Sequence, residues 1–259
     1  MSDRLRSLSP PIVVGIIGLA AWELVLQVVQ PEGFVLPPPS EIVASLVDTW
    51  DAIWVGVQST GSIIVTGLLF GIAWGVLAAL AVSWYRLADE TITPLAIAVS
   101  AIPIIALAPI FNAWFGLLSP RSNQLIVVLL VFFPIFINTT RGLTDIDPDQ
   151  IDLMRSYGAS RRQITKEVRI PNAMPFFFTA LKISASLAVI AAIVSEYFGG
   201  RQDALGPLII QNAGLARYPD AWAAVLAGSL IGIGLYAIAR LLERFAMPWQ
   251  TAVNQGVEE

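Results

Sequence analysis

The sequence contains neither cysteine nor histidine. Without these side chains the chain has no disulfide, and no thiolate or imidazole that could bind a metal or move protons. We therefore expect no metal site and no catalytic residue. Charged residues are also scarce, at 13% of the chain, and the net charge of −4 argues against nucleic acid as a partner. Paired aspartates are missing from the apolar stretches, which argues against an intramembrane protease.

Apolar residues, in contrast, make up 56% of the chain, and the mean hydropathy is +0.72. An α-helix needs roughly 20 apolar residues to cross a hydrocarbon core about 30 Å thick. Several stretches approach or exceed that length, so we predict an all-α membrane protein with six transmembrane helices in one domain, residues 1–259. The predicted spans are residues 11–29, 58–84, 91–116, 124–138, 173–198 and 221–241.

Two of the predicted features interrupt a simple series of straight spans. The third span contains Pro94, Pro103 and Pro109, which predict a kinked or broken helix. Between the first two spans, an amphipathic pattern follows Ser40 and predicts a helix that lies on the membrane surface. Its apolar positions are Ile42, Leu46, Trp50 and Ile53, and its acidic ones are Asp48 and Asp51.

Glycines recur at four-residue spacing in the second span, at Gly67, Gly71 and Gly75. This spacing lets two helices approach closely in lipid, either within one chain or between two copies. We favour packing within the chain.

Arginine and lysine set the predicted orientation. If the N-terminus is cytoplasmic, the inner segments hold eleven of these fifteen residues, the outer segments hold three, and Lys182 lies within a span. Cytoplasmic segments of membrane proteins carry an excess of both residue types. We therefore predict that both termini are cytoplasmic.

Residues 149–171 form a basic, polar segment between the fourth and fifth spans. One short helix is predicted from Asp149 to Tyr157, with Gly158 as its breaker. Ser160 can cap a second helix from Arg161 to Val168, which we expect Pro171 to stop. Connecting segments this long and charged are uncommon in compact chains, so we expect a soluble protein to dock here.

The spacing within this segment resembles the signature of the membrane subunits of binding-protein-dependent ABC importers. That signature reads E-A-A, three residues, G, nine residues, I-x-L-P. The corresponding residues here are Asp152-Leu153-Met154, Gly158 and Val168-Arg169-Ile170-Pro171. The glycine, the proline and the spacing match. The opening triplet departs from the pattern, with aspartate for glutamate and large apolar residues for both alanines.

A second run is similar to one branch of the same family, whose members import taurine, alkanesulfonates, nitrate, pyrimidine precursors or riboflavin. The branch pattern is P-x-x-A-x-A-P-x-x-x-x-W-F-G, and residues 103–116 match it. Glu196 before an aromatic residue and two glycines, followed by Leu205-Gly206, also fits the branch.

The resemblance implies a type I ABC importer permease in the cytoplasmic (inner) membrane, working as a homodimer by alternating access. Two cytoplasmic ATPase subunits would bind ATP and magnesium, since this chain has no phosphate-binding loop. A solute-binding protein would deliver a small polar or anionic organic solute from outside. The segment 149–171 would then act as the coupling helix. Its candidate contact residues are Asp152, Leu153, Met154, Gly158, Ala159, Arg161, Val168 and Pro171.

Two groups of charged residues in this segment have alternative roles. Asp152 can cap or ion-pair within the segment, or touch the ATPase, and we leave both open. The basic residues serve as determinants of orientation and as contacts to anionic lipid, an interpretation that we favour over ATPase contact. They are Arg161, Arg162, Lys166 and Arg169.

The candidate path residues are Ser100, Asn112, Trp114, Asn138 and Glu196. For Ser100, Asn112 and Asn138, hydrogen bonding between helices is the favoured alternative, and for Trp114 the alternative is the interfacial aromatic belt. Glu196 can face the path, contact the binding protein or cap the Gly199–Gly200 loop.

Lys182 is too far from Glu196 to pair with it, since fourteen residues of helix span about 21 Å. We expect Lys182 to extend toward the cytoplasmic interface.

An ATP-independent secondary transporter or channel is the main alternative function, because kinked spans and intramembrane ionisable groups suit it too. This alternative does not explain the basic segment 149–171.

Overall fold

The computed structural model describes residues 2–29 and 36–248, and every element in that part of the chain is helical. The elements are α1 (Ser2–Val29), α2 (Pro39–Asp48), α3 (Trp50–Ser83), α4 (Arg86–Ser100), the 3-10 turn η1 (Ile104–Leu107), α5 (Ala108–Phe115), α6 (Pro120–Thr144), α7 (Pro148–Ser156), α8 (Arg161–Ile164), the π-helical turn η2 (Thr165–Arg169), α9 (Ile170–Glu196), α10 (Leu205–Gly214) and α11 (Tyr218–Ala246).

Four helices in the described part are long and apolar enough to cross a membrane: Trp50–Ser83, Pro120–Thr144, Arg161–Glu196 and Tyr218–Ala246. The helix pair Leu87–Ser100 and Ile104–Phe115 adds a fifth candidate, although the two parts meet at a bend of 74°. Of the three prolines predicted to kink or break this segment, Pro103 lies in that bend, whereas Pro94 lies within α4 and Pro109 in the first turn of α5. The chain is therefore an all-helical membrane protein with four to five candidate spans by length and composition.

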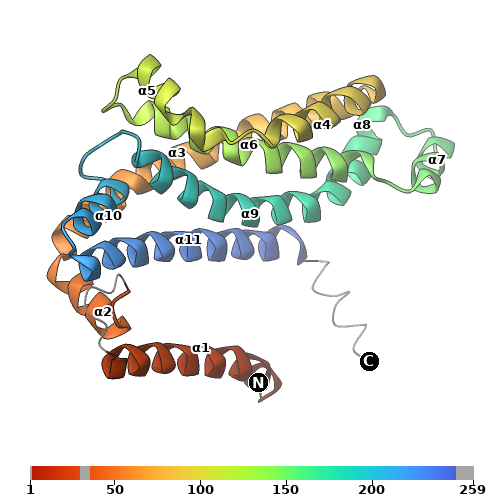
Figure 1. Ribbon diagram of the computed structural model, residues 1–259. Coiled ribbons are helices and arrows are strands. Elements are labelled where there is room, and N and C mark those ends of the chain that lie inside the picture. The colour runs from red at the N-terminus through yellow and green to blue at the C-terminus, as the bar shows by residue number, and fades with distance from the viewer. Residues whose placement is uncertain (1, 30–35, 249–259) are drawn as a thin grey trace.

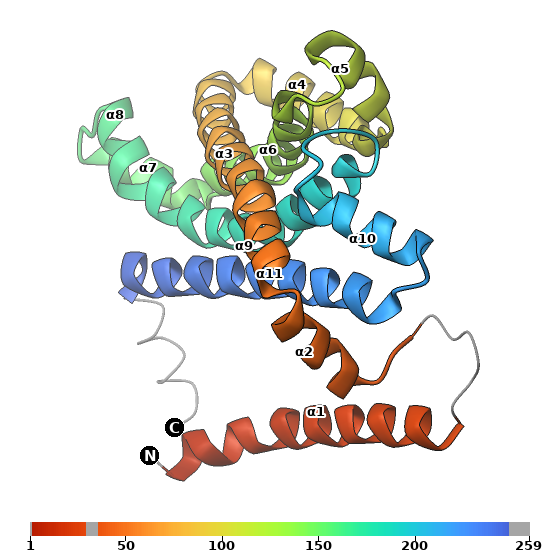
Figure 2. The same cartoon turned by 90° about the vertical axis from the view of Figure 1, so that its left-hand side faces the viewer.

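The long helices run roughly side by side, with α6 and α9 between α3 and α11 (Figure 1). α1 lies beyond α11 and approaches the rest of the chain through α2 (Figure 2). The two ends of this bundle differ. α2, α5 and α10 gather at one end, whereas α7, α8, the start of α1 and the end of α11 gather at the other (Figure 1).

The contact between α3 and α6 depends on the glycine stripe of α3. A Cβ atom at Gly67, Gly71 or Gly75 would lie only 2.5 to 2.7 Å from a side chain of α6. These three positions therefore accept no side chain, and α3 lies directly on α6. Packing within the chain, favoured from the sequence, is confirmed. The facing residues are Val127, Val131 and Ile135, all fully buried.

The surface helix is shorter than its pattern predicted. α2 ends at Asp48, and Thr49 adopts φ −103° and ψ 18°, outside the helical region. Trp50 and Ile53, predicted as its last apolar positions, instead begin α3. The prediction was wrong here because the apolar spacing continues across the break, and nothing in that spacing marks it.

Pro171 does not stop a helix, contrary to our expectation. The helical segment runs without a break from Arg161 to Glu196, and Pro171 lies in the first turn of α9. Proline lacks an N–H and its ring presses on the carbonyl four residues earlier. The π turn just before it, in which the N–H of Ile170 reaches the carbonyl of Thr165, widens the backbone and lets the helix continue.

The segment between the predicted fifth and sixth spans, for which no helix was predicted, contains a further helix, α10, which packs between α3 and α11. Its sequence includes Gly206 and Pro207, two residue types that are typical of loops. The contacts that hold its first turn come from distant residues and are described below.

Candidate functional site

α7 has no buried residue. Its first turn is capped by Asp147, whose carboxylate accepts a hydrogen bond from the Asp149 N–H at 3.0 Å. The large apolar or aromatic side chains exposed here are Leu153 on the helix, 58% exposed, and Tyr157 just after it, 81% exposed. Large exposed apolar groups on a charged helix are typical of a protein-binding surface.

A Schellman motif ends α7. The Gly158 N–H donates to the Arg155 carbonyl at 2.9 Å, and the Ala159 N–H donates to the Met154 carbonyl at 3.1 Å. Gly158 has φ +72°, a conformation that glycine adopts without strain. The direction of the chain after α7 is therefore set by the backbone of Gly158.

The next helix starts with a capping box. The Ser160 N–H donates to Gln163 Oε1 at 2.8 Å, and the Gln163 N–H donates to Ser160 Oγ at 3.3 Å. Gly158 and this box together fix the angle between α7 and α8.

The base of this segment is tied to the spans. Asn172 Nδ2 donates to the carbonyls of Gly142 and Asp145 at 2.8 and 3.0 Å. Arg169 reaches the carbonyls of Ser83 and Leu143 at 3.3 and 3.4 Å, which are the ends of α3 and α6. Arg169 therefore binds the ends of two spans, while its role in orientation and lipid contact stays a prediction. A movement of α7 and α8 would pass directly to α3, α6 and α9.

The structure brings the predicted coupling residues into one segment. Asp152, Leu153, Met154, Gly158, Ala159 and Arg161 lie on α7, α8 and their link, while Val168 and Pro171 lie where the chain enters α9. Asp152 forms an ion pair with Arg155 at 3.1 Å, so its pairing within the segment is observed.

Two of the predicted path residues share a hollow of about 320 Å³ between α4, α6 and α9. They are Ser100 and Asn138, and each bonds to its own helix: Ser100 Oγ to the Ile97 carbonyl at 2.7 Å, and Asn138 Nδ2 to the Pro134 carbonyl at 2.9 Å. Within residues 2–29 and 36–248, the hydrogen bonds between helices that we favoured for these two residues are not formed. The other lining residues are Ile104, Leu130, Phe133, Pro134, Ile137 and Leu187.

A second hollow, of about 460 Å³, lies between α9 and α11 and shares Leu187 with the first. Its lining residues are Thr179, Lys182, Ile183, Ser186, Leu187 and Tyr236.

Lys182 forms an ion pair with Glu243 of α11, with Nζ 2.8 and 2.9 Å from the two carboxylate oxygens. Both side chains are less than a quarter exposed. The sequence predicted that Lys182 extends toward the cytoplasmic interface, and the structure adds a partner for its ammonium group on α11. Its partner lies 61 residues away, and no spacing rule would reveal it.

Glu196 is buried at the opposite end of the bundle, away from both hollows. Its Oε2 accepts hydrogen bonds from the Gly206 N–H at 2.9 Å and from Thr60 Oγ1 at 3.1 Å. Thr60 Oγ1 in turn accepts from the Leu205 N–H at 2.9 Å. Glu196 and Thr60 thus satisfy the first N–H groups of α10. The carboxylate caps a helix, although not the Gly199–Gly200 loop that the sequence suggested.

Asn112 and Asn123 hold that loop. Asn112 Nδ2 donates to the Phe198 carbonyl at 2.9 Å, and Asn123 Nδ2 donates to the Gly199 carbonyl at 3.0 Å. Asn112 also accepts a hydrogen bond from Ser122. Bonding between segments, the favoured alternative for Asn112, is confirmed. The remaining path candidate, Trp114, is 70% exposed and lies away from both hollows.

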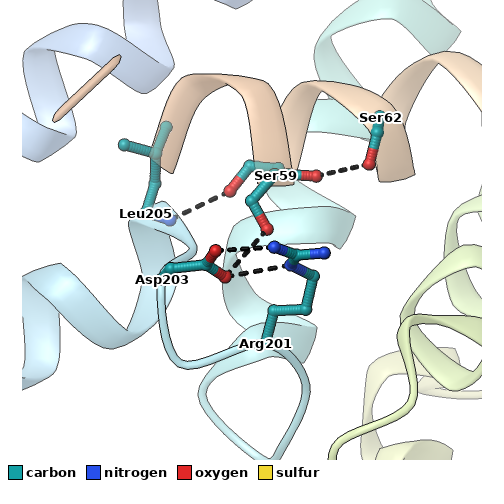
Figure 3. Close-up of polar contacts among 6 residues, drawn as sticks. Ser59, Ser62, Arg201, Asp203 and Leu205 are labelled. Atoms are coloured by element: carbon teal, nitrogen blue, oxygen red, sulfur yellow. Dashed lines mark hydrogen bonds and ion pairs between the residues drawn. The ribbon is translucent and has the colours of Figure 1, made fainter. Parts of the chain in front are cut away.

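Figure 3 shows the next part of the loop between α9 and α10, where Arg201, Asp203 and Ser59 meet. Arg201 binds both carboxylate oxygens of Asp203, at 2.9 and 2.6 Å. This pairing lowers the pKa of Asp203 below its ordinary value and raises that of Arg201. Sequence reasoning missed Thr60 and Asn123, because their partners are distant in the chain, and it also missed Asp203, although Arg201 lies only two residues before it.

The sequence also matches a known protein family. Residues 71–249 match the family described as binding-protein-dependent transport system inner membrane component. The chain belongs to this family. The matched region contains the capped segment α7–α8 and both hollows, and of the contacts at α10 it contains the bond between Gly206 and Glu196 but not Thr60.

Similar proteins agree with this membership. The formylaminopyrimidine transport permease protein ThiX of Halalkalibacterium halodurans is 34% identical, covering 90% of this chain and 92% of that protein. The riboflavin transport system permease protein RibX of Chloroflexus aurantiacus is 28% identical, covering 97% of each. A bacterial ABC transporter that imports the polysaccharide alginate shares the fold, with a TM-score of 0.62 at 16% identity over 93% of this chain and 94% of that one.

The protein is therefore a permease subunit of a binding-protein-dependent ABC importer for small solutes, and a multi-pass protein of the inner membrane. Its family implies a complex with an ABC ATPase and a solute-binding protein. ATP binds to the ATPase, a separate subunit, and the permease carries no cofactor of its own.

Proposed function

We propose that this permease works as a homodimer of six-span subunits with both termini in the cytoplasm, and that α7 and α8 couple it to the ATPase. The six spans would be α1, α3, the bent pair α4–α5, α6, α9 and α11. Residues Val13–Val28 of α1 are apolar, which supports the first of them. An even number of spans agrees with the start of α1 and the end of α11 lying at the same end of the bundle.

The capped and largely exposed segment α7–α8 is the observation that carries the coupling proposal. It presents Leu153 and Tyr157 outward, and it continues into α9, where Arg169 and Asn172 bind the ends of α3 and α6. A rigid element with an apolar tip and a fixed base can pass movement from a docked subunit into the membrane. Closure of the ATPase pair on ATP would thereby drive alternating access.

The solute path is proposed to run past the two hollows, which share Leu187 as a lining residue. Ser100, Asn138, Thr179 and Ser186 place hydroxyl and amide groups on their walls, where contact with lipid would be costly. Pro134 adds to the polarity of the first hollow, because it cannot donate the usual helical hydrogen bond to the Leu130 carbonyl. Asn112, Trp114 and Glu196 are left out of this path.

The solute is proposed to be small, organic and polar or anionic. The relatives reported above are named for a formylaminopyrimidine and for riboflavin, two nitrogen heterocycles. The solute-binding protein would bind this solute first and then deliver it to the permease.

Photo-crosslinking tests the coupling proposal. A photoreactive amino acid at Leu153, in the assembled complex, should trap the ATPase subunit. The matched control is Leu118, also a leucine and similarly exposed, in the link between α5 and α6 at the other end of the bundle. Crosslinks to the ATPase from Leu118, or none from Leu153, would refute the assignment of α7–α8.

Cysteine labelling tests the path, and the absence of native cysteine makes each introduced thiol unique. Asn138→Cys should react with a charged maleimide in nanodiscs. Leu69→Cys, on the exposed apolar face of α3, should stay unlabelled. Protection of Asn138→Cys in every transport state would remove this hollow from the path.

A further inference from the structure

One face of α9 is left uncovered by the rest of the chain. Thr179, Ile183, Ser186 and Ile190 are exposed and follow one another at intervals of four, three and four residues, which places them on one side of the helix. The opposite side of α9 is buried in the bundle. Two of the four exposed residues carry hydroxyl groups, and the second hollow opens on this face.

The charges beside this hollow cancel. The ammonium group of Lys182 lies less than 3 Å from both oxygens of Glu243, so the pair has no net charge. An ammonium group has three donors, and the described residues take up two of them. The third donor is left for a molecule in the hollow.

Further donors line the same hollow. The hydroxyls of Ser186 and Tyr236 form no hydrogen bond with any residue in the described ranges 2–29 and 36–248. Thr179, in contrast, already donates to the Pro175 carbonyl at 2.8 Å. The hollow therefore offers three unused donors, from Lys182, Ser186 and Tyr236, without an uncompensated positive charge.

We infer that this hollow is a selection site that passes an uncharged, hydrogen-bond-accepting solute, of the chemical class of cyclic amides and other oxygen- or nitrogen-bearing heterocycles. The inference rests on the proposed path and narrows the solute class given there. Acceptor oxygens or ring nitrogens of such a solute take hydrogen bonds from Lys182, Ser186 and Tyr236, and the ring of Tyr236 contributes an aromatic surface.

An anionic solute meets a different environment. It approaches Lys182 only beside the carboxylate of Glu243, so attraction and repulsion nearly cancel. Entry into the hollow still removes water from its charge, and that cost is not compensated. The same argument applies with opposite sign to a cation.

Charged thiol reagents test this balance without knowledge of the natural solute. Ser186→Cys places a thiol one helical turn from Lys182. In nanodiscs, the reaction rates of a cationic and an anionic methanethiosulfonate reagent are each divided by the rate with a free thiol in solution. With the native pair in place, the two normalised rates should agree within about twofold, because two cancelling charges exert little net force at a distance.

Removal of either charge should unbalance the rates in opposite directions. Lys182→Met leaves Glu243 alone and should favour the cationic reagent, and Glu243→Gln should favour the anionic one. One unit charge at roughly 7 Å changes the rate of each reagent about threefold to fiftyfold for effective dielectric constants of about 80 to 20, and it acts in opposite directions on the two reagents, so their ratio changes by the square of that factor. The exchanged pair, Lys182→Glu with Glu243→Lys, restores neutrality and should restore the ratio, which guards against effects of misfolding.

The outcomes separate this inference from the proposed path. Ratios that move as stated support the inference. A strong preference for the anionic reagent with the native pair, or ratios that ignore both substitutions, would overturn it, while labelling of Asn138→Cys would still uphold the path. If neither reagent modifies Ser186→Cys, this hollow holds no solute and the inference fails.

Discussion

Substitution of Gly158 by valine should uncouple the permease from its ATPase. Gly158 has φ +72°, and a Cβ atom built there would meet nothing within 4 Å. The penalty is therefore conformational and involves no clash. A residue with a Cβ pays about 1–2 kcal/mol in this left-handed region. The population of the native link between α7 and α8 should then fall about 5- to 30-fold.

Asparagine provides the graded comparison, because it enters the left-handed region far more readily than valine. Gly158→Asn should retain most of the coupling that Gly158→Val loses. Gly61→Ala is the control for loss of a glycine: its site is also open, but it lies within α3 with an ordinary helical backbone. This substitution should be harmless.

The assay is ATP hydrolysis by the complex in nanodiscs, with and without the solute-binding protein, together with the amount of permease in the membrane. Gly158→Val should lose stimulation by the binding protein and retain the ATPase poorly, at normal membrane levels. Full stimulation in Gly158→Val would refute the reasoning. Equal loss in Gly158→Asn would show that the backbone conformation is not what matters.

Three further predictions concern the packing and the outer end of the bundle. Gly71→Val should destabilise the permease by about 1–3 kcal/mol or more in thermal unfolding, since its Cβ would lie 2.7 Å from Val131. Glu196→Ala should lower the free energy of unfolding by about 1–3 kcal/mol, because it leaves buried N–H and O–H groups unpaired. Glu196→Gln should lower it less, because the amide oxygen still accepts these hydrogen bonds. Equal losses in the two variants would contradict this prediction. Arg201 lowers the folded-state pKa of Asp203, so Asp203→Asn should lower the free energy of unfolding by a constant amount above the unfolded-state pKa of about 4. This difference in stability between the native protein and the variant should vanish as pH falls through the folded-state pKa. If the difference is already lost at pH 6, the pairing is refuted.

The sequence predicted the features that depend on local composition and spacing. Apolar length identified the long helices, the prolines predicted the broken segment at α4–α5, and the glycine stripe predicted the contact of α3 with α6. Gly158 and Ser160 were identified as a helix breaker and a cap, because both roles follow from the chemistry of single residues.

The features that the sequence did not predict depend on contacts between distant residues. Lys182 and Glu243 are separated by 61 positions, and Thr60 and Glu196 by 136. Helix α10 depends on the second of these pairs for its first turn, which explains why its glycine and proline suggested a loop. The passage of the helix through Pro171 depends on a π turn that no composition rule predicts.

The central claim is that two copies of this permease move together when nucleotide closes ATPase subunits docked on α7 and α8. A spin label at Lys166→Cys tests it directly. This side chain is 79% exposed at the base of the segment, and it would be the only thiol of the chain. The account predicts one dipolar distance between the two copies, which shortens when the ATPase is held in its ATP-bound state. Absence of a dipolar signal, or the same distance with and without ATP, would contradict it.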